Sequence, residues 1–497
     1  MKTMIKQDQP ADWLIVFLIL EAIDIQVSVD EMFKEVKDIK LKKENKIYVL
    51  QDSIQHIKDP LNINYELSIN ELVYNEQTNA TALTPVQLKG VKPGEGYAWR
   101  DALRQIMVEN ESRVSALITW SHGAGIGIAK ASIEPGDPAV SLDVVRNKIN
   151  LVRNFPNPDR EFIKGHFNCK TLGTTNDTLV VNNTLDEVPC SELQDLFISE
   201  IAEGLSDMAT PVFDIMVMGN CNTQIIDNCY NLNKVAKFYL APITLIETNG
   251  YDFSGFIKTI NDGIPDNNPA NQYGSKKPPI KGDKNYKPYF TDIAKLFLNG
   301  YIRLNESLEK SAAIVVNDLE HILELGPMLN EVCTYFMDNR AVVYPVIDKV
   351  LKIDTITFTD KDFIDVVLLF DTIQKNLKDP VEFNGIYSKL RDFLLNNISV
   401  EKHIGEELDK DSFHCFSIYI PVTIDNSIAQ TFCCQYFREF ANSQFVKETS
   451  WDDFIIDFTI WRIRNKVATA KAQGAVAISK LESINLLRKE ARSVHSK

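Results

Sequence analysis

Apolar residues in the first half of the chain fall in short runs, and between these runs they recur every three or four positions. A short apolar run bounded by polar residues is typical of a buried strand, whereas the second spacing is typical of an amphipathic helix. Strands are predicted at 13–20, 46–50, 115–120, 212–218 and 237–241, and helices at 27–40, 97–108, 191–205 and 222–236. This alternation favours an α/β fold with a mostly parallel sheet flanked by helices.

The pattern changes after residue 290, where helical spacing dominates. Helices are predicted at 310–338, 362–376, 384–397, 427–443 and 451–463, with one strand at 415–420. A stretch rich in Pro, Gly, Asn and Lys is typical of a linker or surface loop. We therefore predict an α/β domain over 1–260, a linker or surface loop over 261–290, a mainly helical C-terminal subdomain over 291–462 and a basic helical tail over 463–497.

Charge is distributed unevenly along the chain. The net charge of −15 argues against a nucleic-acid binder, because affinity for phosphates needs a basic face. The tail nevertheless carries eight Lys and Arg against two Glu, and four apolar residues fall on one stripe of a helix there: Ile478, Leu481, Ile484 and Leu487. The tail is either a solvated helix packed on its own domain or a docking element for an acidic regulatory protein.

Two features bear on the cellular compartment. The eight cysteines show no regular spacing, which in a chain of this size favours reduced thiols. The apolar run 13–20 is flanked closely by acidic residues, and it is far shorter than the roughly 20 residues that a membrane span needs. We expect a core strand at this run, a cytoplasmic protein and no membrane partner.

Candidate chemistry lies where two of the predicted strands end. The strand at 115–120 runs into Ser121-His122-Gly123, and the strand at 212–218 runs into Gly219-Asn220-Cys221. Parallel strands present such residues together at their carboxyl edge, where an imidazole and a thiol make a base and a nucleophile. A helix that starts at Cys221 would lower the pKa of its thiol. The backbone amides of Gly123 and Cys221 are candidate donors to an oxyanion.

A purely structural role would also account for the histidine and the cysteine. A single cysteine at a strand end is often a small buried hydrophobe, and a histidine beside glycines is often only a turn residue. The run Gly123-Ala-Gly125-Ile-Gly127 also invites a dinucleotide-binding interpretation, but that fingerprint needs a glycine at the position of Ile128. With no C-x-x-C pair and no H-E-x-x-H motif, neither a structural nor a peptidase-type zinc site is supported.

Several segments resemble the clostripain family of cysteine peptidases, which belongs to the caspase and gingipain clan. Leu117-Ile-Thr-Trp120 followed by His122-Gly-Ala-Gly125 is similar to the family's L-I-L-W-x-H-G-G-G, and residues 213–221 are similar to the strand that leads to its nucleophile. Further segments are similar to the family and occur in the same order as the family's own segments: Asp12–Val16, Tyr48–Asp52, Gly250–Phe253, Ser311–Leu319, Phe416–Pro421 and Thr449–Phe454. The resemblance covers most of residues 11–460.

The resemblance implies a caspase-like fold and a Cys/His dyad that acts on protein or peptide substrates. Cys221 is then the nucleophile, His122 the general acid/base and Gly123 a donor to the oxyanion. No cofactor is expected. Calcium dependence occurs in relatives, but the sequence contains no Asp/Asn loop with the spacing of calcium ligands, so we assign no calcium site.

The chain departs from the family pattern at the specificity pocket. Members that cut after Arg or Lys carry an Asp two residues before the nucleophile, where this chain has Gly219. Their S-E-E stretch, which lines the same pocket, is replaced by Pro242, Ile243 and Thr244. An Arg buried without a counter-charge is costly, so we expect a small or apolar side chain before the scissile bond.

The leading hypothesis is therefore an intracellular, regulated cysteine endopeptidase of clostripain type. Its relatives often mature by self-cleavage in the loop after the histidine, where this chain has Arg146, Lys148 and Arg153. The altered specificity positions leave open a non-catalytic caspase-like scaffold that acts by protein–protein interaction. A thiol redox sensor is a third interpretation, which predicts reversible oxidation of Cys221 without hydrolysis.

Overall fold

The computed structural model describes most of the chain. The described residues are 10–20, 23–54, 65–91, 98–123, 127–132, 192–209, 211–247, 249–263, 278–279, 282–353, 358–360, 363–420 and 443–469. The predicted helix at 427–443 lies almost wholly outside these residues, as do most of the linker, the loop with Arg146, Lys148 and Arg153, and the apolar stripe of the basic tail.

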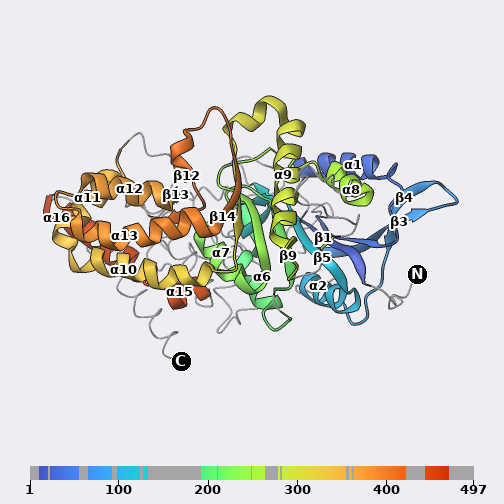
Figure 1. The fold of residues 1–497 in the computed structure, drawn as a ribbon, viewed down its shortest axis with the longest axis horizontal. Coiled ribbons are helices and arrows are strands. Elements are labelled where there is room, and N and C mark those ends of the chain that lie inside the picture. Colours follow the sequence, from blue (N-terminus) through green and yellow to red (C-terminus); the bar gives the residue numbers. More distant parts are fainter. Residues whose placement is uncertain are drawn as a thin grey trace, which may run out of the picture.

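A nine-stranded sheet forms the centre of the molecule (Figure 1). Its strand order is β14-β11-β10-β9-β5-β1-β2-β3-β4. The strands are β1 (Ala11–Leu20), β2 (Asn45–Ile54), β3 (Tyr65–Asn75), β4 (Ala80–Pro85), β5 (Ser112–Trp120), β9 (Phe213–Gly219), β10 (Ala236–Pro242), β11 (Ala313–Asp318) and β14 (Ser399–Ile404). Strands β10, β9, β5, β1 and β2 are parallel, and the strands at both edges are antiparallel to their neighbours. The predicted mostly parallel sheet is confirmed.

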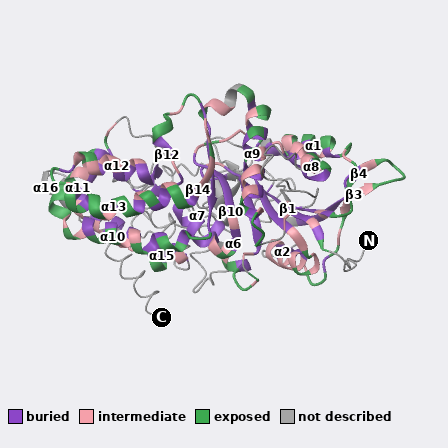
Figure 2. Cartoon of the chain, in the orientation of Figure 1, coloured by how far each residue is buried: buried purple, intermediate pink, exposed green. Residues whose placement is uncertain are grey.

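Helices cover both faces of the sheet because its central strands are apolar on both sides. In β1, Trp13, Ile15, Phe17 and Ile19 face one core, while Leu14, Val16, Leu18 and Leu20 face the other. The first core is covered by α1 (Ile23–Val36), α8 (Phe253–Asp262) and α9 (Tyr286–Asn305). The second is covered by α2 (Ala98–Glu109), α6 (Ile198–Leu205) and α7 (Ile226–Asn231). Figure 2 shows the buried strands between partly exposed helices.

The C-terminal part of the described chain is mainly helical, as predicted, and gathers at one end of the sheet (Figure 1). Its longer helices are α10 (Leu325–Asp338), α11 (Arg340–Val350), α12 (Val366–Asn376), α13 (Val381–Phe393) and α16 (Trp451–Thr469), with the short α15 (Gln444–Glu448) beside α7. A small sheet of β12 (Phe358–Asp360), β13 (Phe363–Asp365) and β15 (Ser417–Tyr419) lies in the same part. Two strands from beyond residue 291, β11 and β14, nevertheless belong to the large sheet.

Four predicted helices differ from the structure, and the fourth, predicted at 362–376, begins only at Val366, after β13. The helix predicted at 310–338 contains strand β11. The Ala-Ile-Val-Val segment of this strand lies between β10 and β14 and pairs with both. The helix predicted at 191–205 begins only at Ile198, after β8 (Glu192–Phe197). This strand pairs with β7 (Gly127–Ser132), and β7 pairs with β6 (His122–Gly123). The helix predicted at 222–236 begins only at Ile226. In the first two cases, pairing with a strand distant in sequence overrides the local spacing.

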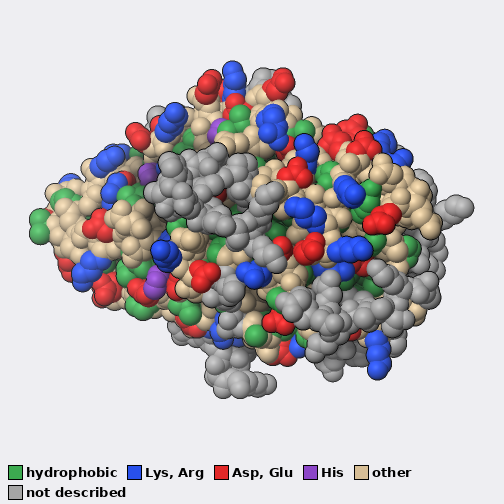
Figure 3. Space-filling view, turned by 45° about the vertical axis from the view of Figure 1, so that its right-hand side comes forward, with side chains coloured by type: hydrophobic (Ala, Val, Ile, Leu, Met, Phe, Trp, Pro, Cys, Tyr) green, Lys and Arg blue, Asp and Glu red, His purple; other side chains and the backbone are tan. Residues whose placement is uncertain are grey.

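Two properties of the surface follow from the described residues. No helix among them is long and apolar enough to cross a membrane. On the face drawn in Figure 3, Lys and Arg side chains are interspersed with Asp and Glu, so neither sign forms a continuous patch over the described part of that face.

Burial of Asp227 in α7 makes the stability of the protein depend on pH. Its carboxyl group is buried, and its pKa is raised to about 7, first by burial and further by Asp452 of α16. Because the folded state binds this proton more tightly than the unfolded state, the proton stabilises the fold. Its contribution to the free energy of unfolding is complete below pH 4 and is lost as the pH rises through 7. The substitution Asp227→Asn is therefore expected to stabilise the protein at pH 8, by at most about 4 kcal/mol, and much less at pH 5.

Urea unfolding at pH 5 and pH 8 measures this difference. The exposed Asp262 provides the matched control, because Asp262→Asn should change stability little at either pH. An equal effect of Asp227→Asn at both pH values would contradict the prediction.

Candidate active site

The segments that carry the two candidate catalytic residues follow neighbouring strands. Strands β5 and β9 are parallel and adjacent, and their last residues, Trp120 and Gly219, stand opposite each other. Just beyond the strands, the backbone N–H of Ser121 donates to the carbonyl of Gly219 at 3.4 Å. The expected meeting of these two strand ends at one edge of the sheet is confirmed. His122 begins strand β6, where its backbone pairs with Ala129.

Gly123 lies directly against the backbone of Cys221. A Cβ atom at position 123 would stand 2.2 Å from the carbonyl oxygen of Cys221 and 2.6 Å from its backbone nitrogen. Any side chain here would require one of the two segments to move, so only glycine allows this approach. The histidine segment and the cysteine segment are therefore in backbone contact beside the thiol.

The thiol of Cys221 is half-buried and contacts the segment that follows β10. The backbone N–H of Ile246 donates to Sγ at 3.4 Å. The S–H of Cys221 in turn donates to the carbonyl oxygen of Ile246, with the sulfur 3.6 Å from that oxygen. The backbone of Ile246 thus both donates to and accepts from the thiol. No sequence pattern pointed to Ile246, because the contact uses backbone atoms and no side-chain signal marks it.

The other cysteines among the described residues differ from Cys221. Cys229, Cys333 and Cys415 are fully buried. Burial raises the pKa of Cys229 to about 12, and it raises the pKa of Cys333 and of Cys415 well above the ordinary value. Buried thiols with raised pKa react slowly, because the thiolate is the nucleophile. Cys221 is the half-buried thiol among these four.

The expected helix at Cys221 is absent, so a helix dipole does not act on its thiol. Residues 221–225 form a turn and an extended segment, and α7 begins at Ile226. This segment is held by longer-range pairing: the N–H of Gln224 donates to the carbonyl of Pro242 at 2.9 Å, and Ile225 forms a bridge with Ser417. These backbone contacts are incompatible with helical hydrogen bonding.

The four predicted specificity residues lie at the same sheet edge but have different environments. Gly219 and Pro242 end strands β9 and β10 and are buried. Ile243 packs in a core cluster with Ala313 and Phe413, so its side chain is directed away from solvent. The Thr244 hydroxyl accepts from the N–H of Ala313 at 2.8 Å, which ties the segment before Ile246 to β11. Of these four, Thr244 is the one that is partly exposed.

Aromatic side chains fill the space beside Gly219. A Cβ atom at this position would lie 2.9 Å from the carbonyl oxygen of Thr119, 3.4 Å from Trp120 and 3.6 Å from Phe253. The rings of Trp120 and Phe253 pack with centroids 4.9 Å apart, and both are buried. An aspartate would not fit here without movement of the neighbouring strand. The segments that resemble the family include Trp120 and Phe253, but the resemblance did not place these two rings beside Gly219.

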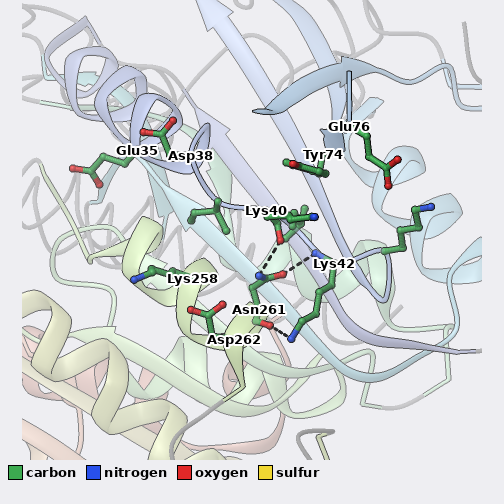
Figure 4. A pocket seen from close by; sticks show the side chains of 12 residues that line it. Glu35, Asp38, Lys40, Lys42, Tyr74, Glu76, Lys258, Asn261 and Asp262 are labelled. Carbon is green, nitrogen blue, oxygen red and sulfur yellow. Dashed lines mark hydrogen bonds between the residues drawn. The ribbon is translucent and has the colours of Figure 1, made fainter. Parts of the chain in front are cut away.

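An open pocket on the surface lies away from this site. It has a volume of about 640 Å³ and is lined by residues from 35–43, the β3 end and α8 (Figure 4). Among the lining residues, the side chain of Asn261 accepts a hydrogen bond from the backbone N–H of Lys42 and donates one to the carbonyl of Lys40. Because residues 40–44 precede β2, this pocket is at the edge of the sheet opposite Cys221. Within the described part of the chain, no group of three or more His, Cys, Asp or Glu residues could hold a metal ion.

Three solved structures are similar to this chain. A secreted cysteine protease from Bacteroides thetaiotaomicron, called iotapain, has 11% identity and a TM-score of 0.50, with 89% of this chain and 100% of that chain covered. A secreted protease of the same organism, solved with an irreversible peptide inhibitor, has 12% identity and a TM-score of 0.47, with 88% and 99% covered. An inactive zymogen protease from Parabacteroides distasonis has 11% identity and a TM-score of 0.48, with 89% and 99% covered.

The likeness to iotapain concerns the fold, which is a mostly parallel sheet flanked by helices. No curated protein sequence matches this chain. A family model described as the clostripain family matches residues 185–461, which is more than half of the chain. The matched region includes Cys221 and begins after His122. The chain thus belongs to the clostripain family of cysteine peptidases.

Proposed function

We propose that this peptidase hydrolyses internal peptide bonds with a dyad of Cys221 and His122. The observation that carries the proposal is the backbone contact between Gly123 and Cys221, which joins the segment after β5 to the segment after β9. Of the four cysteines among the described residues, Cys221 alone is not fully buried. It also receives an N–H hydrogen bond on Sγ.

The reaction follows from these two groups. The thiolate of Cys221 attacks the peptide carbonyl, and a tetrahedral intermediate forms whose oxyanion accepts hydrogen bonds from the amides of Gly123 and Cys221. The intermediate collapses as the C–N bond breaks, and the imidazolium of His122 gives its proton to the leaving amine. Water then attacks the thioester, with His122 as base, and releases the new carboxylate and the thiolate.

We further propose that the residue before the scissile bond is small or apolar. Position 219 carries no carboxylate, and Trp120 and Phe253 occupy the space beside it. A guanidinium or ammonium group placed there would be desolvated without a counter-charge, which costs several kcal/mol.

A library of peptides incubated with the wild-type protein and with Cys221→Ala tests both statements. Cleavage by the wild type alone, after small or apolar residues, is the expected result. Cleavage mainly after Arg or Lys would contradict the specificity but not the activity. The absence of cleavage by either protein, together with no labelling of Cys221 by a halomethyl ketone, would favour the non-catalytic scaffold.

We also propose that the enzyme acts in the cytoplasm and is regulated there. The support is that three buried cysteines among the described residues, Cys229, Cys333 and Cys415, are free thiols. Two of the similar solved proteins are described as secreted, a statement that concerns those proteins. Cell fractionation with an antibody against the chain tests the location, and protein recovered from the culture medium would overturn it. We also propose that a regulatory protein binds the basic tail.

A further inference from the structure

Asn220 lies between the strand β9 and the nucleophile, and its side chain connects the two catalytic segments. It is fully buried. Its Oδ1 accepts a hydrogen bond from the hydroxyl of Thr119 in β5, and its Nδ2 donates to the carbonyl of Ser121 at 3.0 Å. One amide group therefore contacts the histidine segment both at the end of β5 and at the residue next to His122.

The backbone of Asn220 is held by a hydrogen bond as well. The hydroxyl of Thr223 donates to the carbonyl of Asn220 at 2.9 Å. Thr223 is itself buried, and its carbonyl accepts from the Tyr239 hydroxyl at 2.9 Å and from Asn228 Nδ2 at 2.8 Å. These bonds anchor the turn that carries Cys221 to strand β10 and helix α7. Asn220 thus joins an anchored turn to the end of β5.

We propose that Asn220 is a positioning residue, which sets the separation between the Cys221 thiol and the His122 imidazole. This inference rests on the proposed dyad. Regular strand pairing between β5 and β9 ends at Trp120 and Gly219, and beyond that point single contacts join the two segments, among them the backbone contact of Gly123 with Cys221. The Asn220 amide continues the link between the two segments past the last strand pair.

The contacts require an amide at this position. The group must accept from Thr119 and donate to a carbonyl at the same time, and an amide side chain does both, through its oxygen and its nitrogen. An aspartate of the same shape would direct an oxygen at the Ser121 carbonyl and would place a charge in a buried site. The Thr119 hydroxyl also lies 3.2 Å from the sulfur of Met218, but a thioether is a weak acceptor and the Asn220 oxygen is the stronger one.

The expected consequence is a loss of turnover rather than of substrate binding. Proton transfer within the dyad needs heavy atoms about 3 Å apart, and a displacement of about 1 Å can cost about 10²-fold in rate. We expect Asn220→Ala to lower kcat about 10²-fold, with KM changed less than about threefold. We expect Thr119→Val, which removes one of the two contacts, to lower kcat about tenfold. Thr119→Ser keeps the hydroxyl that Thr119→Val removes, so its kcat is expected to stay within about threefold of the wild-type value.

The pH dependence of Cys221 alkylation separates positioning from simple stability. Iodoacetamide reacts with the thiolate, so the rate against pH reports the pKa of the Cys221 thiol. If Asn220 holds the imidazole near the thiol, Asn220→Ala shifts this profile to higher pH in the same direction as His122→Ala. Melting temperatures and circular dichroism of each variant establish that the folded protein is being compared.

Four outcomes decide the matter. A shifted profile with reduced kcat in Asn220→Ala, and rescue in Thr119→Ser relative to Thr119→Val, supports the proposal. A profile and kcat equal to the wild type in Asn220→Ala overturns it, provided that His122→Ala does shift the profile. If His122→Ala leaves the profile unchanged, the proposed dyad itself fails. Should Asn220→Ala not fold, the two Thr119 variants decide, because equal kcat in both would overturn the proposal.

Discussion

Replacement of Cys221 by alanine is expected to lower kcat/KM for peptide hydrolysis by about 10⁴-fold or more, the scale of loss on removing a nucleophile that acts with a base. Without Sγ no thioester forms, and the remaining amides only bind the substrate. His122→Ala is expected to approach the same loss, because the thiol loses its base and the leaving amine loses its proton donor. The double variant should be no less active than Cys221→Ala, since the two groups act as one unit.

Steady-state kinetics on a peptide taken from the library measure these losses. Cys229→Ala is the matched control, because it removes a second thiol of the same region that is fully buried and has a raised pKa. This control is expected to lose some stability through the cavity it leaves, while its folded fraction keeps its activity. Hydrolysis by Cys221→Ala close to the wild-type rate would contradict the assignment of the nucleophile. Hydrolysis by His122→Ala within about tenfold of the wild type would exclude His122 as the base.

Gly123→Ala is expected to lower kcat by about 10² to 10³-fold, since a methyl group at this position cannot coexist with the Cys221 backbone. The added Cβ would stand 2.2 Å from the Cys221 carbonyl oxygen, which is well inside van der Waals contact. Either the histidine segment or the nucleophile segment must then move. That movement disturbs both the proposed dyad and the proposed amide donors to the oxyanion.

Two other glycines separate this effect from general destabilisation. At Gly405 an added Cβ would lie 2.1 Å from the carbonyl oxygen of Lys310, an equally severe clash against different backbone. Gly405→Ala should therefore lower the melting temperature while its folded fraction retains kcat. Gly385 is exposed in α13 with open space around it, so Gly385→Ala should stabilise the protein by about 0.5–1 kcal/mol. Equal kcat losses in Gly123→Ala and Gly405→Ala would contradict a specific role for Gly123.

Local patterns were sufficient for the central strands. The run Trp13–Leu20 contains no polar residue, so it could be stable only in a strand or helix that is buried on all sides, and its closely spaced acidic flanks limit it to strand length. The runs that end before His122 and Cys221 are mostly apolar as well, although they contain Ser115, Thr119 and Asp214, which are buried in the sheet. Because parallel strands align their carboxyl ends, the meeting of these two segments followed from the pattern once the sheet was predicted.

The sequence by itself therefore determined the fold class, the central strands and the pair of residues to test. Tertiary structure alone decided where β11 replaces a helix, why α7 begins at Ile226, and which atoms contact the thiol. These features depend on hydrogen bonds and packing between residues distant in the sequence, such as Gln224 with Pro242 and Trp120 with Phe253. A local pattern contains no information about such partners, because backbone donors are the same in every residue and the fit of a side chain depends on what the fold places beside it.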